Sequence, residues 1–436
     1  MPPRSPSASA AGEPWSRYRA REGSVFVSIY RLFGLTPLVN AAGTKTRLGG
    51  VPMDPEVRQA MDEAAGSSVD MAQLQAAASR VIAEATGAEA GYVTSGAAAG
   101  LTLGAAACMT GEDPALIDRL PFTDGMPNQI VIARTHRNSY DHAWRAAGAR
   151  LVEAGVDDRA VGSGMRAIEP WEIEAAIGPD TVAVAYVANR RDDPPLREIV
   201  EVAHRHRLPV LVDAAAQLPP ASNLRAFIDI GADLVAFSGG KAVRGPQATG
   251  ILCGRRDLIR AVLLNHLDMD QLAGHWEPPS ELFPDGLSAG LPRHGVGRGF
   301  KVGKENVIGL LVALQRFVAG PAPDDEARRR RIVHDVNAAL SGDERVEVHE
   351  NPAFGIPRLE LRFAAADAAA AVLRGLEAGE PAIAVDPGRV AEGVLVVDTI
   401  GLDDDEGRIV AERLATLVSR LPEPKRAADG ASEPTS

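Results

Sequence analysis

The chain has 436 residues, of which 45% are hydrophobic and 24% charged, the composition of a globular protein long enough for two domains. Its formal net charge of −12 makes the surface repel phosphate backbones, so we expect no nucleic-acid partner. No apolar run approaches the ~20 residues of a membrane span, and the first residues lack the apolar stretch of a secretory signal. Two cysteines, Cys108 and Cys253, form neither a disulfide framework nor a zinc site, and we expect a cytoplasmic protein.

The first 254 residues are predicted to form short apolar strands that alternate with helices. Residues 1–14, rich in Pro, Ser and Ala, are predicted to be disordered. The helices are expected at residues 69–85, 97–108, 141–147, 196–206 and 224–230. The strands are expected at residues 91–94, 129–133, 151–152, 182–187, 209–213, 234–237 and 250–253. This alternation predicts a mainly parallel sheet with helices on both faces.

The remainder of the chain changes in composition. Residues 275–300 are rich in Gly, Pro, His and Arg, which is typical of a long functional loop. A helix at residues 304–317 is expected to bridge to a smaller domain. The strands of that domain are expected at residues 358–363, 382–385 and 394–397, and its helices at 367–376 and 406–419. We therefore predict an α/β fold with a large domain (51–300), a small C-terminal α/β domain (within 301–421) and a disordered tail (422–436).

A turn that can bind phosphate follows the strand at 91–94. Ser95, Gly96 and Ala97 lead into a helix, and the backbone N–H groups and dipole of a helix start attract phosphate. The Ser95 hydroxyl can contribute a further hydrogen bond. A Ser-Gly turn is also an ordinary helix cap, so this motif alone does not decide between the two interpretations.

Two charged residues follow later strands. Asp213 ends the strand at 209–213, and the carboxyl end of a buried parallel strand faces the ligand crevice. The strand at 234–237 continues into Ser-Gly-Gly-Lys, in which the glycines give Lys241 room to project. Taken singly, Asp213 is equally well a helix-capping residue and Lys241 an exposed loop lysine.

The order of these features predicts the cofactor. A phosphate turn, an aspartate and a lysine 28 residues later are the groups that pyridoxal 5′-phosphate (PLP) needs. The aspartate would keep the pyridine nitrogen protonated and so strengthen the ring as an electron sink. A lysine that forms a Schiff base with the PLP aldehyde must be partly desolvated and able to swing. We therefore predict a PLP enzyme in which Lys241 carries the cofactor.

Seven stretches of the chain carry a family resemblance. They are LVNAAGTKTRLGG from Leu38, YVTSGAAAGLTLGAAACMTG from Tyr92, IVIARTHRNSYDHAWRAAGARLVEAG from Ile130, LPVLVDAAAQLPP from Leu208, GADLVAFSGGKAVRGPQATGIL from Gly231, RGFKVGKENVIGLL from Arg298 and AGEPAIAVD from Ala378. With them, residues 36–420 resemble the selenocysteine synthase-like group of fold-type I PLP enzymes. This group has a class V aminotransferase-like fold and includes D-glucosaminate-6-phosphate ammonia-lyase. The motif is more specific for the cofactor than for the reaction.

The resemblance implies roles for individual residues. Lys241 would form the Schiff base and Asp213 would pair with the pyridine nitrogen. The phosphate would be held by Ser95, Gly96 and Ala97, with Ser238 and Arg244 as further candidates. The resemblance places Gln217 near the ring hydroxyl and His136 over the ring, with His142 as the alternative to His136.

Substrate contacts are expected from arginines and from the N-terminal segment. In this family, the segment that corresponds to residues 15–50 approaches an active site. The candidates are Asn40, Thr44 and Arg47 in that segment, and Arg298 and Arg358 elsewhere. An arginine fork can hold a carboxylate, although each of these arginines is equally able to form an ordinary salt bridge. Arg293 is a rival candidate, and His294 a candidate for a loop that closes the site.

The expected reaction is an α,β-elimination of the dehydratase or ammonia-lyase type on a small amino acid or amino-sugar acid. Lys241, once displaced by the substrate amine, would act as general base on the α-proton. Racemisation or epimerisation, β-replacement of the selenocysteine synthase type and a non-enzymatic scaffold are the alternatives. The residues before the family match are not basic, which disfavours tRNA as a substrate. The resemblance also implies a homodimer or a larger homo-oligomer.

Overall fold

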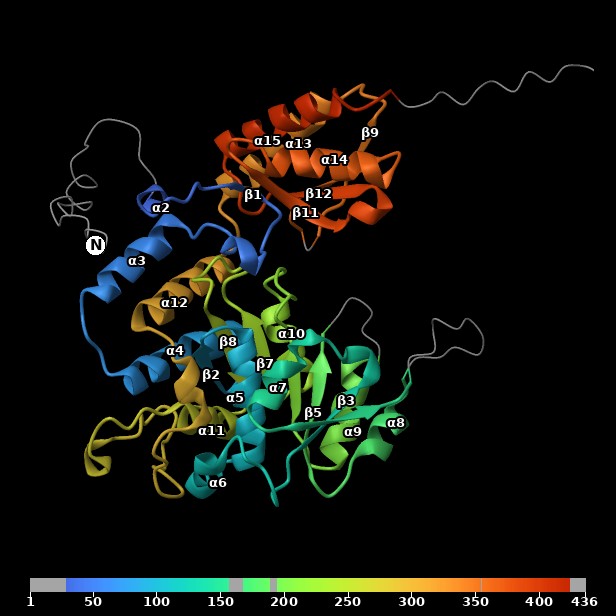
Figure 1. The fold of residues 1–436 in the computed structure, drawn as a ribbon. Coiled ribbons are helices and arrows are strands. Elements are labelled where there is room, and N and C mark those ends of the chain that lie inside the picture. The colour runs from blue at the N-terminus through green and yellow to red at the C-terminus, as the bar shows by residue number, and fades with distance from the viewer. Residues whose placement is uncertain (1–28, 157–167, 189–193, 354, 424–436) are drawn as a thin grey trace, which may run out of the picture. The chain divides into compact units, whose positions relative to one another are not determined.

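The computed structural model describes residues 29–156, 168–188, 194–353 and 355–423. The chain divides into two compact units (Figure 1). The large unit is Thr44–Pro323, and the small unit joins the chain up to Gly43 to the chain from Asp324 onward. We expected domain boundaries near residues 50 and 300, and the helix expected to bridge the domains lies within the large unit. The disorder predicted for residues 1–14, and for most of 422–436, falls outside the described residues.

The large unit is built on a seven-stranded sheet, which confirms the predicted fold class. Its strands are β2 (Ala90–Thr94), β3 (Gln129–Ala133), β4 (Arg150–Ala154), β5 (Thr181–Val187), β6 (Val210–Asp213), β7 (Leu234–Ser238) and β8 (Gly250–Gly254). Their order is β2-β8-β7-β6-β5-β3-β4. The strands from β7 to β4 are parallel, and β8 runs antiparallel to both of its neighbours.

Helices cover both faces of this sheet because successive strand residues point to opposite faces. In β6, for example, Val212 packs into one hydrophobic cluster and Leu211 into the other. The helices on the Val212 side are α3 (Pro55–Ala65), α4 (Met71–Thr86), α8 (Pro170–Ala176), α9 (Leu196–Arg205), α10 (Asn223–Ile230) and α12 (Lys304–Ala319). Those on the Leu211 side are α5 (Ala97–Thr110), α6 (Pro114–Arg119), α7 (His142–Ala146) and α11 (Arg256–His266).

The small unit is a five-stranded sheet with helices on one face. The strands, in spatial order, are β1 (Val39–Ala41), β11 (Ile383–Arg389), β12 (Val394–Asp398), β10 (Arg358–Phe363) and β9 (Val346–Glu350). Only the pairing of β1 with β11 is parallel. The helices α13 (Pro323–Leu340), α14 (Ala366–Glu377) and α15 (Asp404–Val418) contribute to its hydrophobic core, and a short α2 (Ile29–Leu32) precedes β1.

The strands predicted in the large unit are all present, with ends that shift by at most two residues. The elements that the sequence reasoning did not assign include β1, β9 and α11. The strand β1 has three residues and is defined by its parallel partner β11, so its own sequence carries little signal. In contrast, α11 places Leu258, Ile259 and Val262 at helical spacing, a pattern that could have been recognised. Among the described residues, no helix is both long and apolar enough to cross a membrane.

Candidate active site

Several predicted site residues lie at one edge of the large sheet. Because β5, β6 and β7 are parallel, their carboxyl ends meet at the same edge, and β2, antiparallel to β8, also ends there. The pairing register aligns Val187 with Asp213 and Asp213 with Ala236. It also aligns Ser238 with Gly250, and Gly250 with Thr94. The sheet therefore brings together the segments that carry Ser95, Asp213 and Lys241.

Close backbone packing shapes the turn that holds Lys241. A Cβ on Gly239 would lie 2.4 Å from Thr249 Oγ1 and 2.5 Å from Leu310 Cδ1. A Cβ on Gly240 would lie 2.6 Å from the backbone of Gln247. The surrounding atoms therefore leave no room for a side chain at either glycine before Lys241. This steric limit explains the two glycines better than the conformational freedom on which the sequence prediction relied.

Lys241 and Asp213 are both partly desolvated, and the charge of each acts against the change that burial makes in the pKa of the other. Burial lowers the pKa of the Lys241 amine, and the nearby Asp213 carboxylate partly offsets this change. Burial raises the pKa of Asp213, while a hydrogen bond from the Ala215 N–H (3.0 Å to Oδ1) and the charge of Lys241 act against it. A lysine with a lowered pKa is a better nucleophile and base near neutral pH.

The turn at Ser95–Ala97 has the features of an anion site. Gly96 adopts φ +105° and caps α5 without a side-chain hydrogen bond, so no side chain occupies the helix start. The Thr94 hydroxyl donates to the Gly96 carbonyl (2.8 Å), and the Ser95 hydroxyl donates to the Phe300 carbonyl (2.7 Å). A Cβ on Gly250 would lie 2.4 Å from the Gly96 carbonyl carbon, so β8 supports the turn from behind.

His136 is fixed beside the same edge. It ends a 3-10 turn (Arg134–His136) that follows β3, and it is only 2% exposed. Its Nδ1 accepts from the Val187 N–H (3.4 Å), and its ring packs edge-on against Tyr186 at 4.6 Å. His142, the alternative, is exposed.

Gln217 and Arg244 differ in how their side chains are used. The Gln217 amide donates to the Ala188 carbonyl (2.9 Å), which ties the segment after β6 to the end of β5. The guanidinium of Arg244 donates instead to the Pro52 carbonyl and contacts Asp54. The expectation that Arg244 meets a phosphate is therefore not supported, because its charge already has a carboxylate partner.

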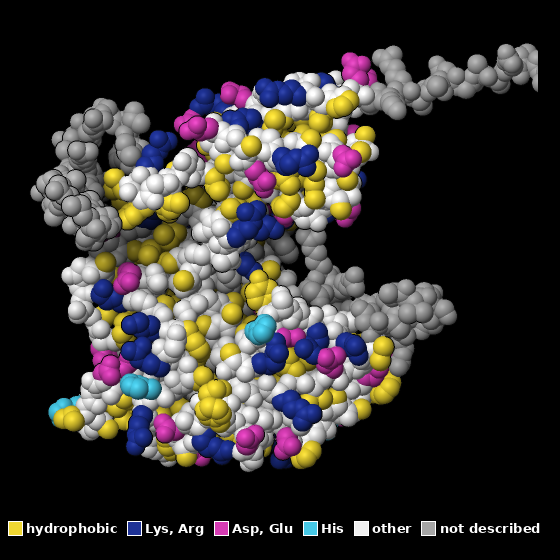
Figure 2. Space-filling view, in the orientation of Figure 1, with side chains coloured by type: hydrophobic (Ala, Val, Ile, Leu, Met, Phe, Trp, Pro, Cys, Tyr) yellow, Lys and Arg dark blue, Asp and Glu magenta, His cyan; other side chains and the backbone are white. Residues whose placement is uncertain are grey.

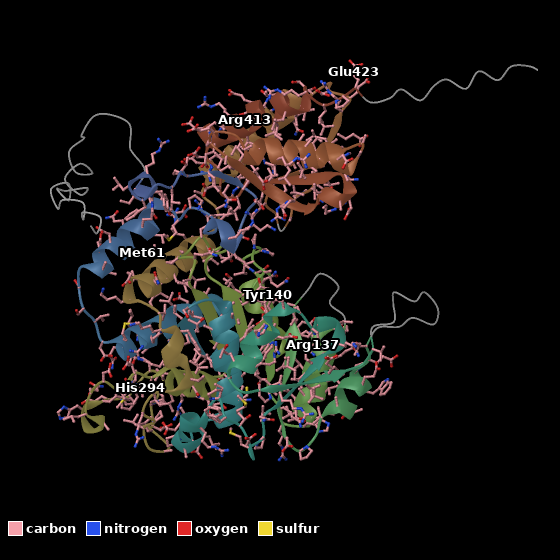
Figure 3. All side chains as sticks on the ribbon, in the orientation of Figure 1. Met61, Arg137, Tyr140, His294, Arg413 and Glu423 are labelled. Atoms are coloured by element: carbon pink, nitrogen blue, oxygen red, sulfur yellow. The ribbon has the colours of Figure 1, made fainter. Side chains whose placement is uncertain are left out.

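Two candidates from the loop at residues 275–300 have acidic neighbours. Arg298 forms an ion pair with Asp268 (2.7 Å), and His294 lies near Asp268 and Asp270. Figure 3 shows His294 at the lower left of the large unit, apart from Arg137 and Tyr140, which are labelled nearer its middle and follow His136 in the chain. Arg293 is exposed.

The N-terminal candidates divide between the units. Thr44 and Arg47 belong to the large unit, and Arg47 is exposed in a 3-10 turn. In the small unit the Asn40 side chain hydrogen-bonds to the Ala42 and Gly43 backbone, and Arg358 pairs with Asp398 (2.7 Å). The roles of these four residues in substrate binding remain predictions.

A second region of the large unit is a cavity of about 680 Å³ beside α11 and the starts of α4 and α12. Its lining includes Tyr92, His266, Arg298 and Lys301, and none of the predicted cofactor residues. The Tyr92 hydroxyl lies 2.9 Å from His266 Nδ1, and burial lowers the pKa of His266 to about 4. Sequence reasoning did not single out either residue, because Tyr92 only opens the stretch that leads to Ser95 and His266 lies outside every stretch that carries the resemblance.

One face of the molecule shows how the charged side chains are distributed. On the face seen in Figure 2, Lys and Arg side chains are scattered among Asp and Glu, and apolar side chains lie between them. This face therefore carries no continuous basic stripe of the kind that tracks a nucleic-acid backbone.

Comparison with known proteins gives consistent matches along most of the chain. The aminotransferase class-V family model matches residues 127–268. A 5′-C-glycyluridine monooxygenase-decarboxylase of Streptomyces sp. is 33% identical over 405 residues, which cover 89% of this chain and 92% of that protein. A D-glucosaminate-6-phosphate ammonia lyase of Salmonella typhimurium is 31% identical over 417 residues, which cover 91% and 97%.

A solved structure of D-glucosaminate-6-phosphate ammonia-lyase has the same fold. It matches with a TM-score of 0.74 and 28% identity, and the match covers 91% of this chain and 99% of that one. The matched relatives are enzymes of the PLP-dependent class V type. The chain therefore belongs to the D-glucosaminate-6-phosphate ammonia-lyase-like group of fold-type I PLP-dependent enzymes.

Proposed function

We propose that the protein is a PLP-dependent lyase that catalyses α,β-elimination, with release of ammonia, from a small amino acid or an amino-sugar acid. The observation that carries this proposal is the match to D-glucosaminate-6-phosphate ammonia lyase over 97% of that protein's length. The sheet-edge arrangement of Lys241 and Asp213 supports it, since a partly buried lysine with a lowered pKa lies close enough to the Asp213 carboxylate to interact with its charge.

The sheet-edge residues fit PLP. A partly buried lysine beside a buried carboxylate matches the aldehyde and the pyridine nitrogen, and the uncapped start of α5 matches the phosphate. We propose that Lys241 and Asp213 hold the ring, that Ser95, Gly96 and Ala97 hold the phosphate, and that Ser238 assists. His136 and Gln217 would contact the ring. When bound, PLP supplies an electron sink that stabilises negative charge at the substrate Cα.

Lys241 and Asp213 then have separate tasks. With the cofactor bound, the Lys241 Nζ would be the group that accepts the α-proton of the substrate, and the burial that lowers its pKa favours the unprotonated amine that this task needs. The Asp213 carboxylate would pair with the pyridine nitrogen, and the Ala215 N–H and the charge of Lys241 favour its ionised form against the effect of burial. His136, whose ring contacts Tyr186 and the Val187 N–H, would lie over the ring of the cofactor.

A second candidate function follows from the relative with 33% identity, which is named a monooxygenase-decarboxylase. Both relatives match about nine-tenths of this chain at similar identity, so overall similarity does not separate the two reactions. The alternative is an oxidative decarboxylation of an amino acid with O₂ as the oxidant. Racemisation and β-replacement remain further alternatives for the same lysine.

One experiment separates these reactions. The purified protein, incubated with PLP, is given a panel of D- and L-amino acids and phosphorylated amino-sugar acids in H₂O and in D₂O. Ammonia with a keto acid and no O₂ uptake supports the proposed elimination. CO₂ release with O₂ consumption supports the oxygenase, inversion at Cα without ammonia supports a racemase, and no turnover of any substrate overturns the proposal.

We further propose that the enzyme acts in the cytoplasm as a homodimer or larger homo-oligomer. Among the described residues both cysteines are unpaired thiols, which suits a reducing compartment. Light scattering coupled to gel filtration measures the oligomer, and a mass of 45.8 kDa would contradict this part of the proposal.

A further inference from the structure

The turn that carries Lys241 contains a backbone conformation that L-residues rarely adopt. Among the described residues, only Arg207 (φ +58°) and Arg244 (φ +59°) are non-glycine residues with positive φ. An L side chain in this region is crowded by its own backbone, so the conformation persists only where other contacts hold it. Arg207 is an exposed residue in a surface connection, whereas Arg244 follows Lys241 by three positions.

The Arg244 guanidinium is held on two groups from a distant part of the chain. Its Nε and one terminal nitrogen donate to the Pro52 carbonyl at 3.2 Å and 3.1 Å. The other terminal nitrogen lies 3.0 Å from Asp54 Oδ1, and the side chains of both residues are less than one-fifth exposed. The planar fork of an arginine fits this combination of a carbonyl and a carboxylate, which an ammonium cannot reproduce.

The Asp54 carboxylate pairs with two arginines and does not cap its own helix. It occupies the N-cap position of α3, where an aspartate normally accepts from the first backbone N–H groups, yet it makes no side-chain cap. Oδ1 instead faces Arg244, and Oδ2 lies 3.3 Å from Nε of Arg316 in α12. Asp54 therefore links the segment that carries Lys241, through Arg244, to the start of α3 and, through Arg316, to α12.

The conformation of Arg244 closes the turn around Lys241. The Arg244 N–H donates to the Lys241 carbonyl (2.9 Å), and the next N–H, of Gly245, donates to the Gly239 carbonyl (2.9 Å). A second contact joins the same two parts of the chain, because the Gln247 side chain donates to Thr46 Oγ1 (3.3 Å). A change in the backbone at Arg244 therefore moves the segment from which the lysine amine projects.

We propose that Arg244 is a positioning residue, which uses its Pro52 and Asp54 contacts to hold the Lys241 amine where it can bond the cofactor. This inference rests on the proposed PLP site and concerns how tightly and in what geometry the cofactor is held. It does not depend on which of the candidate reactions follows. Asp54 acts in the same way, one step further from the lysine.

Arg207 provides a matched control. Arg244→Gly and Arg207→Gly both relieve a positive φ of the same size, but only the first removes the guanidinium contacts. The variants Arg244→Lys and Asp54→Asn complete the set. For each holoenzyme we would measure the rate of PLP release to an acceptor protein, the pH titration of the visible absorption band, and kcat and KM for an active substrate.

We expect Arg244→Gly to release PLP faster than wild type, to shift the pH midpoint of the absorption band, and to lower kcat about 10- to 100-fold with a smaller change in KM. Asp54→Asn should change the PLP release rate, the pH midpoint and kcat in the same direction. For Arg244→Lys, these three quantities should lie between those of Arg244→Gly and those of wild type. Arg207→Gly should leave all of them unchanged.

Two results would overturn the inference. One is an Arg244→Gly enzyme with the PLP release rate and absorption titration of Arg207→Gly. The other is an Arg244→Gly protein that melts at a lower temperature while both cofactor readouts stay at wild-type values, which would show a purely structural role. A wild-type protein that stays colourless with PLP would overturn the proposed function and this inference together, so the two failures are distinguishable.

Discussion

The sheet edge around Lys241 and the cavity beside α11 both carry charged residues, but they pair them differently. At the sheet edge, Lys241 is partly buried and Asp213 is buried. Burial is the main cause of the pKa shift of each residue. At the cavity, Arg298 is more than a third exposed and meets Asp268, which is also exposed. The comparison teaches that charge alone does not mark a reactive site; desolvated charge with few partners does.

The largest effect expected at the sheet edge is that of Lys241→Ala. This variant removes the amine that bonds the cofactor and takes the α-proton, so we expect kcat to fall by at least about 10³-fold. The visible band that borohydride abolishes in wild type should be absent. Absorption spectra and single-turnover assays check this, and a variant that keeps both the band and the activity would show that another lysine does the chemistry.

Asp213→Asn tests the second buried charge. The amide keeps the size of the side chain but cannot stabilise a protonated pyridine nitrogen, so we expect kcat to fall about 10²- to 10³-fold. Cofactor analogues whose ring nitrogen carries a permanent positive charge should restore part of the rate. If Asp213→Asn keeps the wild-type kcat and the analogues do not change it, Asp213 does not pair with the pyridine nitrogen.

At the cavity, we expect His266 to affect the free energy of unfolding rather than the rate of the reaction. Burial lowers the pKa of His266 from 6.5 to about 4, so between these pH values the unfolded chain binds a proton that the folded chain does not. Stability is therefore expected to fall as the pH drops through this window, by up to about 3 kcal/mol. His266→Gln keeps an acceptor for the Tyr92 hydroxyl and should flatten the pH dependence of the free energy of unfolding; parallel curves would contradict the prediction.

The smallest effect is expected for the ion pair between Arg298 and Asp268. Exposed pairs contribute about 0–1 kcal/mol, and salt screens them. We expect Asp268→Asn to change the free energy of unfolding by less than about 1 kcal/mol, with no difference left in 1 M NaCl. A loss of several kcal/mol that persists in salt would place this pair among the buried groups and weaken the contrast between the two regions.

Much of the fold followed from the sequence because the strands of the large unit are apolar on both sides. The runs that end in Asp213 and Ser238 are recognisable without any partner, and their alternation with helices implies a parallel sheet. The division into two units depends in part on a long-range strand pairing. The strand β1 takes its partner from β11, more than 300 residues away, and no local pattern near residue 40 reports that pairing.

The candidate site divides in the same manner. Lys241, Asp213 and Ser95 were recognised in sequence because each ends or follows a strand, and strand ends in a parallel sheet must meet. The clamp of Arg244 on Pro52 and Asp54 was not recognisable, because it joins residues almost 200 positions apart through a single side chain.

The sequence by itself thus determined the family, and it predicted the cofactor and the three strand ends proposed to carry the chemistry, since these depend on local patterns and on the geometry common to parallel sheets. The tertiary structure alone decided which charges are desolvated and which are paired. It gave Arg244 a carboxylate partner in Asp54, and Arg298 one in Asp268. The physical reason is that a side chain's pKa and its partners depend on burial and on residues remote in sequence, which no local motif records.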